Sequence, residues 1–483
     1  MSVNSLPTST PAKEGVDAEV VERFIGALET TEGVEPHSLM ILRHGSVVAA
    51  GWWSPYTSER LQLLYSLSKS FTSTAVGLAA AEGLLRFDDP VLSYFPELDA
   101  EITNPRSRSM LVRHIAAMSS GHLEDTWQRA STSRLEDPVR GFLELPPEHD
   151  PGTVFAYNQS ATYTLARIVQ RVTGTTLTNY LRSRLLDPIG ADRVAWSQHP
   201  PGQDMGFTGL HATTDTIARF GELYLRNGVW AGKQLLPADW VGEATRRHIA
   251  TDAVTDPAVG DKPDWRLGYG YQFWRSKHGY RGDGAYGQYC IVLPEHDVVI
   301  AMTSQSSDTQ ALLNLVWHEL LPAFQESSRG DTTADTHLEE RLANLKLRPS
   351  NPDTTAPTDA VRWTDAGFSP AGGRCLEQPS LKRVGITQTA SGWHVSLAED
   401  GAQLIVPLGN SWEVGHWDGE IAPVVASGGW YHGGTLRVEL VFIETPHRLV
   451  VKCEPAGGTF TATWITEPRG GSTLRALAAP RAL

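Results

Sequence analysis

The hydrophobic periodicity of the first 325 residues changes from strand to helix and back to strand. Two apolar runs across 38–50 are separated by the turn residues His44-Gly45 and predict a hairpin. From about 86 to 200 the pattern is mostly helical. Strand-like runs then return over 269–274, 287–293 and 298–303. Because strands stand at both ends, the pattern predicts an α+β fold whose sheet is closed by distant segments.

The composition divides the chain of 483 residues, which is too long for one ordinary domain. Residues 326–360 are polar and rich in Ser, Thr, Asp and Pro, which is typical of a linker. The residues after this segment form short alternating runs between Gly- and Pro-containing turns, a pattern that indicates an all-β antiparallel barrel or sandwich. We therefore predict a disordered N-terminus at 1–15, an α+β domain at 16–325, a linker at 326–360 and an antiparallel β-barrel domain at 361–483.

Charge and cysteine usage exclude several classes of function. The net charge of −14 argues against non-specific binding to nucleic acid or anionic lipid. The three cysteines are far apart and form no CxxC motif, and no apolar run is long enough to span a membrane. The polar N-terminus lacks the apolar core of a secretory signal. The simplest interpretation is a cytoplasmic protein with neither nucleic-acid nor membrane partners, and a homo-oligomer stays open.

A serine and a lysine, Ser66 and Lys69, stand at the start of an apolar helical run over 71–84. At this spacing the two side chains share one helix face. The unpaired N–H groups of the first helical turn favour negative charge near the serine. A neighbouring lysine of lowered pKa can accept a hydroxyl proton, as in acyl-enzyme serine hydrolases. The alternative is an N-cap serine followed by a solvated lysine.

Two further segments have the composition that such a site requires. The loop 151–160 contains Tyr157, which could carry a proton if cationic neighbours lower its pKa from about 10. The segment 280–288 concentrates glycines before an apolar strand, and glycine in a strand often marks the close approach of a backbone or ligand. The structural alternatives are a core tyrosine and a bulged hairpin.

Five segments, in order, resemble landmarks of the penicillin-recognising serine hydrolases, the family of class C β-lactamases, D-stereospecific peptidases and related esterases and amidases. They lie at 65–84, 112–122, 206–224, 268–274 and 287–295. The resemblance spans about residues 15–325 and implies a β-lactamase-like fold, with an antiparallel sheet flanked by helices and a helical subdomain. The C-terminal region resembles the lipocalin-like modules that some members carry, which would shape the cleft or hold subunits together.

The resemblance also implies roles for individual residues. Ser66 would be the nucleophile and Lys69 its activating partner. Tyr157 would be the general base that later protonates the leaving group. The backbone N–H groups of Ser66 and Ala285 would form the oxyanion hole. No metal and no cofactor are implied.

Two departures from the family pattern affect the substrate. The usual Tyr-x-Asn appears as Tyr157-Asn158-Gln159, so the substrate-binding amide would belong to Asn158 or Gln159. The Lys/His-Thr-Gly motif falls on Gly282-Asp283-Gly284, three further candidates for substrate binding, and its cation is missing. The neighbouring Arg281 would point the other way along a strand. Loss of a charge-assisted contact worth about 1.5–3 kcal/mol argues against penicillin-like substrates.

The leading hypothesis is hydrolysis of an ester or amide through an acyl-Ser66 intermediate. One alternative is acyl transfer on the same site, by a D-aminopeptidase or a peptide-cyclising thioesterase. The other is a non-catalytic protein that binds a ligand on the same scaffold. The sequence identifies neither the acyl group nor the leaving group.

Overall fold

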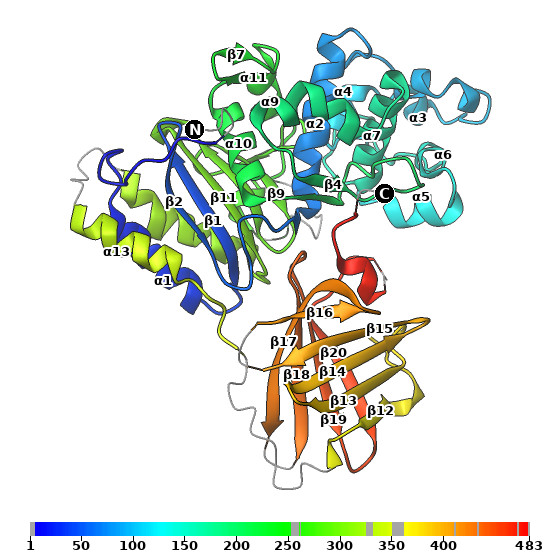
Figure 1. The fold of residues 1–483 in the computed structure, drawn as a ribbon. Helices are drawn as coiled ribbons and strands as arrows, with labels where there is room; N and C mark the ends of the chain where they lie inside the picture. Colours follow the sequence, from blue (N-terminus) through cyan, green and yellow to red (C-terminus); the bar gives the residue numbers. More distant parts are fainter. Residues whose placement is uncertain are drawn as a thin grey trace. The chain divides into compact units, whose positions relative to one another are not determined.

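The structure is a computed structural model, and it describes residues 5–252, 260, 262–324, 332–349, 362–409, 412–431, 434–470 and 473–481. Backbone contacts divide the chain into two compact units (Figure 1). The first unit holds residues 1–51 and 64–343 together with the last four residues of the chain, and the second holds Trp52–Leu63 and Asn344–Ala479.

The first unit is built on a six-stranded sheet of order β2-β1-β11-β10-β9-β8. The strands are β1 (Pro36–Arg43), β2 (Ser46–Trp52), β8 (Trp274–Arg275), β9 (Tyr280–Gly284), β10 (Gln288–Leu293) and β11 (Val298–Ser304). Strand β1 pairs antiparallel with β11, in a register that sets Ile41 opposite Ile300. Segments far apart in sequence therefore close one sheet, which confirms the predicted α+β fold.

The turn between β1 and β2 is His44-Gly45, with φ of 52° and 79°, as the pattern predicts. The expected strand over 269–274 is wrong, because only its last residue lies in β8. Gln272 within this segment has φ 62°, a left-handed conformation that interrupts an extended strand.

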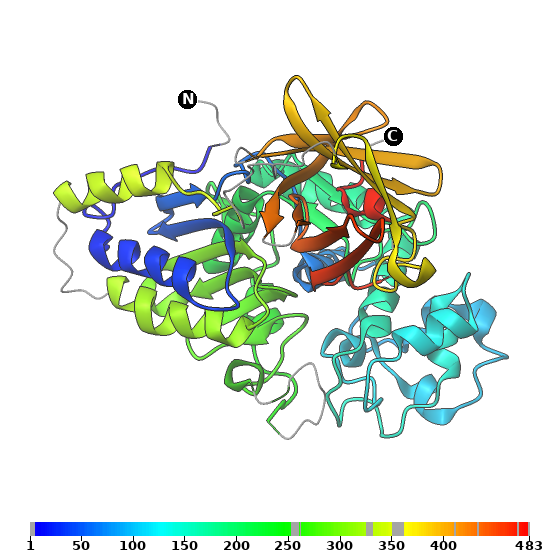
Figure 2. The same ribbon diagram turned by 90° about the horizontal axis from the view of Figure 1, so that it is seen from below.

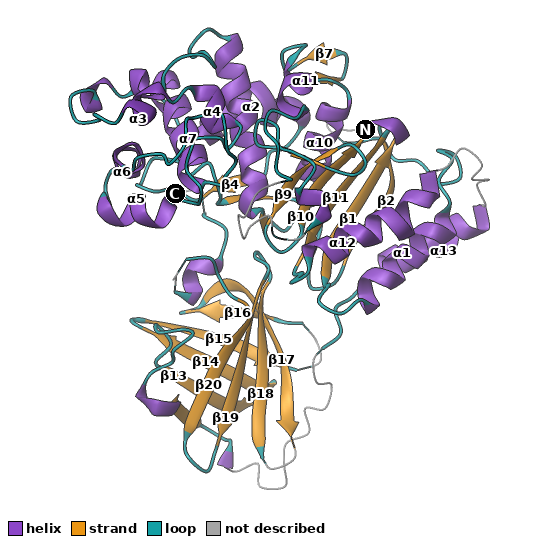
Figure 3. Cartoon of the chain, turned by 180° about the vertical axis from the view of Figure 1, so that it is seen from behind, coloured by secondary structure: helices purple, strands orange, loops and turns teal. Residues whose placement is uncertain are grey.

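Helices lie on both faces of this sheet (Figure 3). Helix α10 (Thr214–Leu225) packs on β1, β10 and β11. Helices α1 (Ala18–Thr30), α12 (Thr309–Leu315) and α13 (Thr332–Ala343) pack against one another as a second layer. The remaining α-helices of this unit are α2 (Ser68–Ala81), α3 (Pro105–Ser109), α4 (Val112–Ala116), α5 (Trp127–Ser133), α6 (Pro138–Glu144), α7 (Gln159–Thr173), α8 (Leu177–Leu181), α9 (Asp187–Ile189) and α11 (Trp240–Thr245).

Short strands and tight helical turns complete the first unit. The short strands are β4 (Val194–Trp196), β5 (Leu210–Ala212), β6 (Val229–Trp230) and β7 (Lys233–Gln234). The 3₁₀ turns are η1 (Tyr65–Leu67), η2 (Val91–Tyr94), η3 (Pro96–Leu98), η5 (Pro263–Trp265), η6 (Pro294–His296) and η8 (Leu321–Phe324). Two π-helical turns are η4 (Arg182–Leu186) and η7 (Val316–Leu320). Helices α3 to α9 correspond to the predicted helical subdomain, coloured cyan to green in Figure 2.

The second unit is a closed barrel of nine strands in its described part. They are β12 (Ala366–Pro370), β13 (Arg383–Thr389), β14 (Gly392–Glu399), β15 (Ala402–Leu408), β16 (Val414–Trp417), β17 (Glu420–Tyr431), β18 (Thr435–Phe442), β19 (His447–Glu454) and β20 (Thr459–Thr466). Consecutive strands are antiparallel, β12 closes the barrel parallel to β20, and β15 and β17 share one further parallel pairing at Leu408 and Ala426. The interior is filled by apolar side chains, among them Trp363, Phe368, Trp417 and Phe442. The unit also holds β3 (Gln62–Leu63), η10 (Ala371–Gly373) and η11 (Leu474–Leu477).

The boundaries between regions differ from the expected ones. Of the linker expected at 326–360, residues 326–331 and 350–360 lie outside the described residues, and the described part, 332–349, contains α13 of the first unit. Within the N-terminus expected to be disordered, residues 5–15 are described, and Thr8 forms a bridge with Val47 of β2. Among the described helices, none combines the length and the apolar composition needed to cross a membrane.

Candidate active site

Ser66 lies in the 3₁₀ turn η1, which continues directly into α2. Tyr65, the residue before it, has φ 48°, an uncommon conformation for a residue other than glycine. Ser68 holds this conformation, because its hydroxyl donates to the carbonyl of Tyr65 at 2.5 Å and accepts the N–H of Leu210 at 3.1 Å. The Ser66 side chain is left half-buried at the start of the helix.

Lys69 is only 1% exposed, so the solvated lysine of the alternative hypothesis is not what the structure contains. Its Nζ donates to Ser66 Oγ at 2.9 Å and to the carbonyl of Phe207 at 2.8 Å. The same Nζ lies 4.8 Å from the centre of the Tyr157 ring. The Lys69 ammonium group therefore lies between the Ser66 hydroxyl and the Tyr157 ring.

Tyr157 is half-buried in the loop before α7, and its ring stacks on Trp274 at a centroid distance of 5.5 Å. Its hydroxyl is hydrogen-bonded to Tyr269. Burial raises the pKa of Tyr269 well above its ordinary value, so the Tyr269 hydroxyl keeps its proton. We infer that Tyr269 donates this hydrogen bond and Tyr157 accepts it.

The two amides of the tyrosine motif have different surroundings. Asn158 is 0% exposed and caps α7, where its Oδ1 accepts from Ser160 N and Thr126 Oγ1, each at 3.0 Å. The Asn158 side chain therefore stabilises the start of α7. Gln159 is half-buried, and its Oε1 has no hydrogen-bond partner within the described part of the chain. Of the two amides, only Asn158 has its side-chain oxygen engaged by hydrogen bonds of the described residues, and Gln159 Oε1 is a buried oxygen.

Gly282 and Gly284 allow β9 to pass close to the Ser66 turn. A Cβ at Gly284 would lie 2.1 Å from the carbonyl oxygen of Leu64, and one at Gly282 would lie 2.3 Å from Cδ1 of Leu67. The space left by the two missing side chains is therefore occupied by Leu64 and Leu67 of the protein. On the Gly282 face of β9, the space that a side chain would need is taken by Leu67.

We expect Gly284→Ala to lower the free energy of unfolding by about 3 kcal/mol and Gly282→Ala by about 1 kcal/mol, measured by chemical denaturation. The difference arises because backbone opposes the first Cβ, whereas the end of a side chain opposes the second. Gly26→Ala in α1, where the Cβ meets nothing within 4 Å, is the control and should stabilise the protein. Equal effects at Gly284 and Gly26 would contradict the close approach.

Asp283 and Arg281 form a buried ion pair on the other face of β9. Arg281 is 0% exposed, and its Nε donates to Asp283 Oδ2 at 2.9 Å. Its Nη1 donates to Ser276 Oγ at 2.8 Å. Burial raises the pKa of Asp283, although Arg281 opposes the shift. Strand alternation therefore turns Arg281 away from the Gly282 face, as expected.

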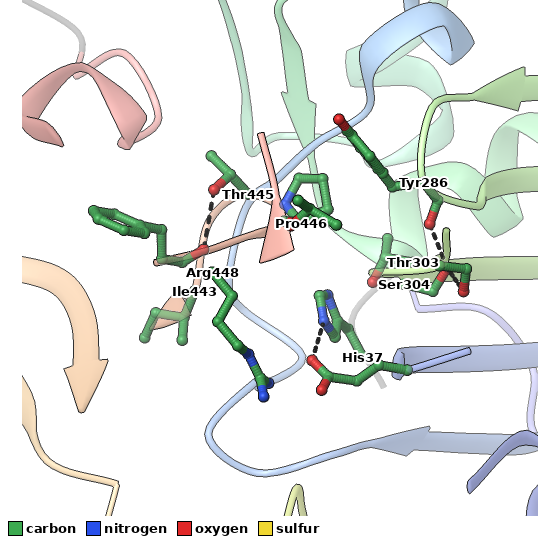
Figure 4. Close-up of polar contacts among 12 residues, drawn as sticks. His37, Tyr286, Thr303, Ser304, Ile443, Thr445, Pro446 and Arg448 are labelled. Atoms are coloured by element: carbon green, nitrogen blue, oxygen red, sulfur yellow. Dashed lines mark hydrogen bonds and ion pairs between the residues drawn. The ribbon is translucent and has the colours of Figure 1, made fainter. Parts of the chain in front are cut away.

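Ala285 follows β9 and begins a turn that is fixed to the end of the sheet. Tyr286 has φ 65°, and its carbonyl accepts from Ser304 Oγ at 2.7 Å (Figure 4). Its ring lies 5.6 Å from that of Tyr65. The residues next to Ser66 and Ala285 thus contact each other, which brings the two expected oxyanion donors to the same region.

Phe207, Tyr269 and Trp274 line the site although no motif in the sequence predicts a role for them. All three lie within segments that resemble family landmarks, which was the available signal. Their contacts with Lys69 and Tyr157 join segments distant in sequence, so local pattern cannot predict them.

An α+β scaffold that places a buried lysine on the hydroxyl of a helix-start serine defines the class of the protein as a serine hydrolase. Residues 21–321 match the family model described as Beta-lactamase, and the chain belongs to this family.

Two relatives align over most of their own length. The chain is 28% identical over 339 residues to the 6-aminohexanoate-dimer hydrolase of Paenarthrobacter ureafaciens, covering 66% of this chain and 84% of that protein. It is 25% identical to penicillin-binding protein 4 of Amycolatopsis lactamdurans, covering 62% of this chain and 88% of that protein.

Solved structures share the fold at lower identity. A penicillin-binding protein homologue from Caulobacter crescentus superposes with a TM-score of 0.52 at 16% identity, covering 66% of this chain and 99% of that one. The octameric penicillin-binding protein homologue from Pyrococcus abyssi has a TM-score of 0.51 at 15% identity and covers 90% of this chain and 98% of its own.

Proposed function

We propose that the protein hydrolyses an amide or ester bond through an acyl-Ser66 intermediate, with Lys69 and Tyr157 as the general base and acid. The observation that carries this proposal is the position of Lys69 Nζ, 2.9 Å from Ser66 Oγ and 4.8 Å from the Tyr157 ring. A nucleophile and two proton carriers therefore meet around one buried nitrogen.

In this mechanism Ser66 Oγ attacks the substrate carbonyl and loses its proton to the Lys69–Tyr157 pair. The backbone N–H groups of Ser66 and Ala285 receive the oxyanion. The carbonyl–heteroatom bond then breaks, and Tyr157 returns the proton to the departing amine or alcohol. Water attacks the acyl-Ser66 ester with the same groups acting in reverse, and the carboxylic acid is released.

The surroundings favour a substrate without a carboxylate next to the scissile bond. Gly282 contributes no side chain, and Arg281 is engaged by Asp283. Among the aromatic residues of this region, Tyr286 is half-buried, whereas Tyr65 and Trp274 are buried. One relative is named for hydrolysis of the 6-aminohexanoate dimer, which directs attention to amides outside the lactam class. We propose short amides or esters as substrates, with the half-buried Gln159 side chain as a substrate-binding group.

The test is a panel of nitrophenyl esters, amides, D-aminoacyl anilides and a chromogenic cephalosporin, followed by kcat/KM and by the mass of the intact protein. We expect turnover of esters or amides, a transient acyl adduct and little cleavage of the cephalosporin. Preferred cleavage of the cephalosporin would contradict the substrate class. Exclusive aminolysis of a peptidyl thioester would replace hydrolysis by acyl transfer, and the absence of any adduct or turnover would favour a ligand-binding protein.

The hydrogen bond from Tyr269 leads to a prediction about pH. We expect Tyr269→Phe to move the acidic limb of the kcat/KM profile about one to two pH units higher. A hydrogen bond donated to a phenolate contributes about 1.5–3 kcal/mol, and one unit corresponds to about 1.36 kcal/mol. Loss of the donor makes removal of the Tyr157 proton harder, so activity is lost at the acidic side. The charged groups near these tyrosines are Lys69 on α2 and the Asp283–Arg281 pair on β9.

Tyr271→Phe is the matched control for this profile. Tyr271 is a nearby buried tyrosine whose ring stacks on Phe87 and His248. We expect Tyr271→Phe to keep the acidic limb of the kcat/KM profile at the wild-type pH. An unchanged profile for Tyr269→Phe would remove Tyr269 from the mechanism, and wild-type rates for Tyr157→Phe would remove Tyr157 as the base.

A further inference from the structure

The hairpin turn between β9 and β10 carries Ala285, the second expected oxyanion donor, and lies against the Ser66 turn within the first unit. A Cβ on Gly284 would come within 2.1 Å of the carbonyl oxygen of Leu64, so the backbones of the two turns are in close contact. The N–H of Gly287 donates across the turn to the carbonyl of Gly284 at 3.2 Å. This carbonyl and the N–H of Ala285 belong to one trans peptide and point in opposite directions, so the Ala285 N–H points out of the turn.

Two consecutive carbonyls of this turn are held by donors outside the turn's own hydrogen bond. Gln288 Nε2 donates to the carbonyl of Ala285 at 3.1 Å. The carbonyl of Tyr286 accepts from Ser304 Oγ at 2.7 Å, as Figure 4 shows, and from the N–H of Ser306 at 3.0 Å. The conformation of the turn is therefore fixed from the end of the sheet.

Gln288 connects these supports to one another. It is the first residue of β10 and is 1% exposed, and its Nε2 also donates to the carbonyl of Ser304 at 2.7 Å. Ser304 is the last residue of β11 and is 0% exposed. One buried amide group therefore ties the Ala285 carbonyl to the neighbouring strand. Hydrogen bonds in a buried, low-dielectric site make such a link stiff.

The backbone beside each expected oxyanion donor has an uncommon conformation. Tyr286, which follows Ala285, has φ 65°, and Tyr65, which precedes Ser66, has φ 48°. Turn positions with positive φ ordinarily hold glycine or asparagine. A larger residue stays in this region only where its surroundings over-determine the conformation, and such residues cluster at functional sites. The hydrogen bonds around Gln288 supply this constraint for the Ala285 turn.

From these contacts we infer that Gln288 is a positioning residue for the oxyanion hole. By holding the Ala285 carbonyl it restricts the backbone dihedrals of Ala285 and thereby the direction of the Ala285 N–H. The inference rests on the proposed function, in which this N–H and that of Ser66 receive the oxyanion. Preorganised donors stabilise the transition state more than the bound substrate, so their misalignment lowers kcat more than it changes KM.

The test is Gln288→Met, which keeps an unbranched side chain of similar length and removes both hydrogen bonds. We expect a 10- to 100-fold loss in kcat with KM changed less than three-fold. The second measurement is inhibition by phenylboronic acid, in which Ser66 Oγ adds to boron and gives up its proton. Because the tetrahedral adduct places an anionic oxygen where the oxyanion forms, we expect its inhibition constant to rise about 10- to 100-fold.

Gln378→Met is the control for loss of a buried amide. Gln378 is 4% exposed in the barrel unit, and its Nε2 donates to Ser380 Oγ at 2.7 Å. We expect this variant to lower Tm and to keep the wild-type kcat and inhibition constant. A Gln288→Met protein that behaves in the same way would overturn the inference, because the two hydrogen bonds would then serve stability alone. A raised KM with unchanged kcat would overturn it as well.

If Gln288→Met does not fold, Ser304→Ala removes the side-chain donor to the Tyr286 carbonyl and should lower kcat about three- to ten-fold. An unchanged kcat would again overturn the inference. Fluorophosphonate labelling of the wild-type protein separates the two levels of failure. Without labelling at Ser66 the proposed function fails and the inference fails with it, whereas labelled wild type beside a fully active Gln288→Met protein overturns the inference alone.

Discussion

Ser66→Ala is expected to lose all fluorophosphonate labelling and to lower kcat by about 10⁴-fold or more. Alanine keeps the Cβ and removes only the hydroxyl, which accepts a hydrogen bond from Lys69 at 2.9 Å. Without this oxygen no acyl-enzyme can form, so the effect falls on the chemical step. The measurements are the mass of the labelled protein and kcat for the best ester or amide of the panel.

Ser73→Ala is the matched control on the same helix. Ser73 is 2% exposed, and its hydroxyl donates to the carbonyl of Tyr271 at 2.6 Å. Its loss should lower the free energy of unfolding by about 1 kcal/mol and leave labelling intact. If Ser66→Ala were labelled like wild type, the nucleophile would lie elsewhere.

Lys69→Met is expected to lower the rate of acylation by about 10²–10⁴-fold while the protein stays folded. Methionine fills most of the buried volume but neither donates to nor accepts a proton from Ser66. A buried ammonium carries a desolvation cost, and an apolar replacement removes this cost. Loss of the bond to the Phe207 carbonyl opposes that gain, so we expect Tm to change little.

Single-turnover labelling of Ser66 and a thermal unfolding curve check both parts of this expectation. Lys233→Met replaces an exposed lysine on β7 and serves as the control for loss of one positive charge. A Lys69→Met protein that acylates at the wild-type rate would show that Tyr157 activates Ser66 without the lysine.

The lack of a side chain at position 282 of β9 has a structural explanation. In this chain the space on the Gly282 face is filled by Leu67 of the Ser66 turn. A larger side chain at position 282 would therefore displace the Ser66 turn. Substitution at one residue would not restore a carboxylate-binding cation, since Leu67 and Ser70 would both have to move.

Features that depend on neighbouring residues were predictable from the sequence. The turn at His44-Gly45 requires two residues that tolerate positive φ, and both have it. The spacing of Ser66 and Lys69 predicts a shared helix face, and the structure has Nζ and Oγ 2.9 Å apart. The barrel was predictable as well, because its strands alternate between buried and exposed residues, as in β20.

Predictions failed where backbone conformation departs from the local pattern. The segment 269–274 reads as a strand, but left-handed Gln272 interrupts it, and its side chain instead donates to the carbonyl of Ala116 at 2.7 Å. Strand β9, with two glycines and Asp283, has a composition that disfavours strands, and it forms because β10 pairs with it. In both cases a contact outside the segment outweighed the intrinsic preference: a hydrogen bond to the distant Ala116 for Gln272, and pairing with the next strand for β9.

By itself the sequence determined the classes of element, the two kinds of architecture and the serine–lysine pair, because each depends on spacings within one turn or one strand. Only the tertiary structure decided which amide beside Tyr157 caps α7, what a side chain at position 282 would meet and which unit holds Trp52–Leu63. These features depend on contacts between residues far apart in the chain. Such contacts are selected by packing and hydrogen bonding of the whole fold, which no local periodicity encodes.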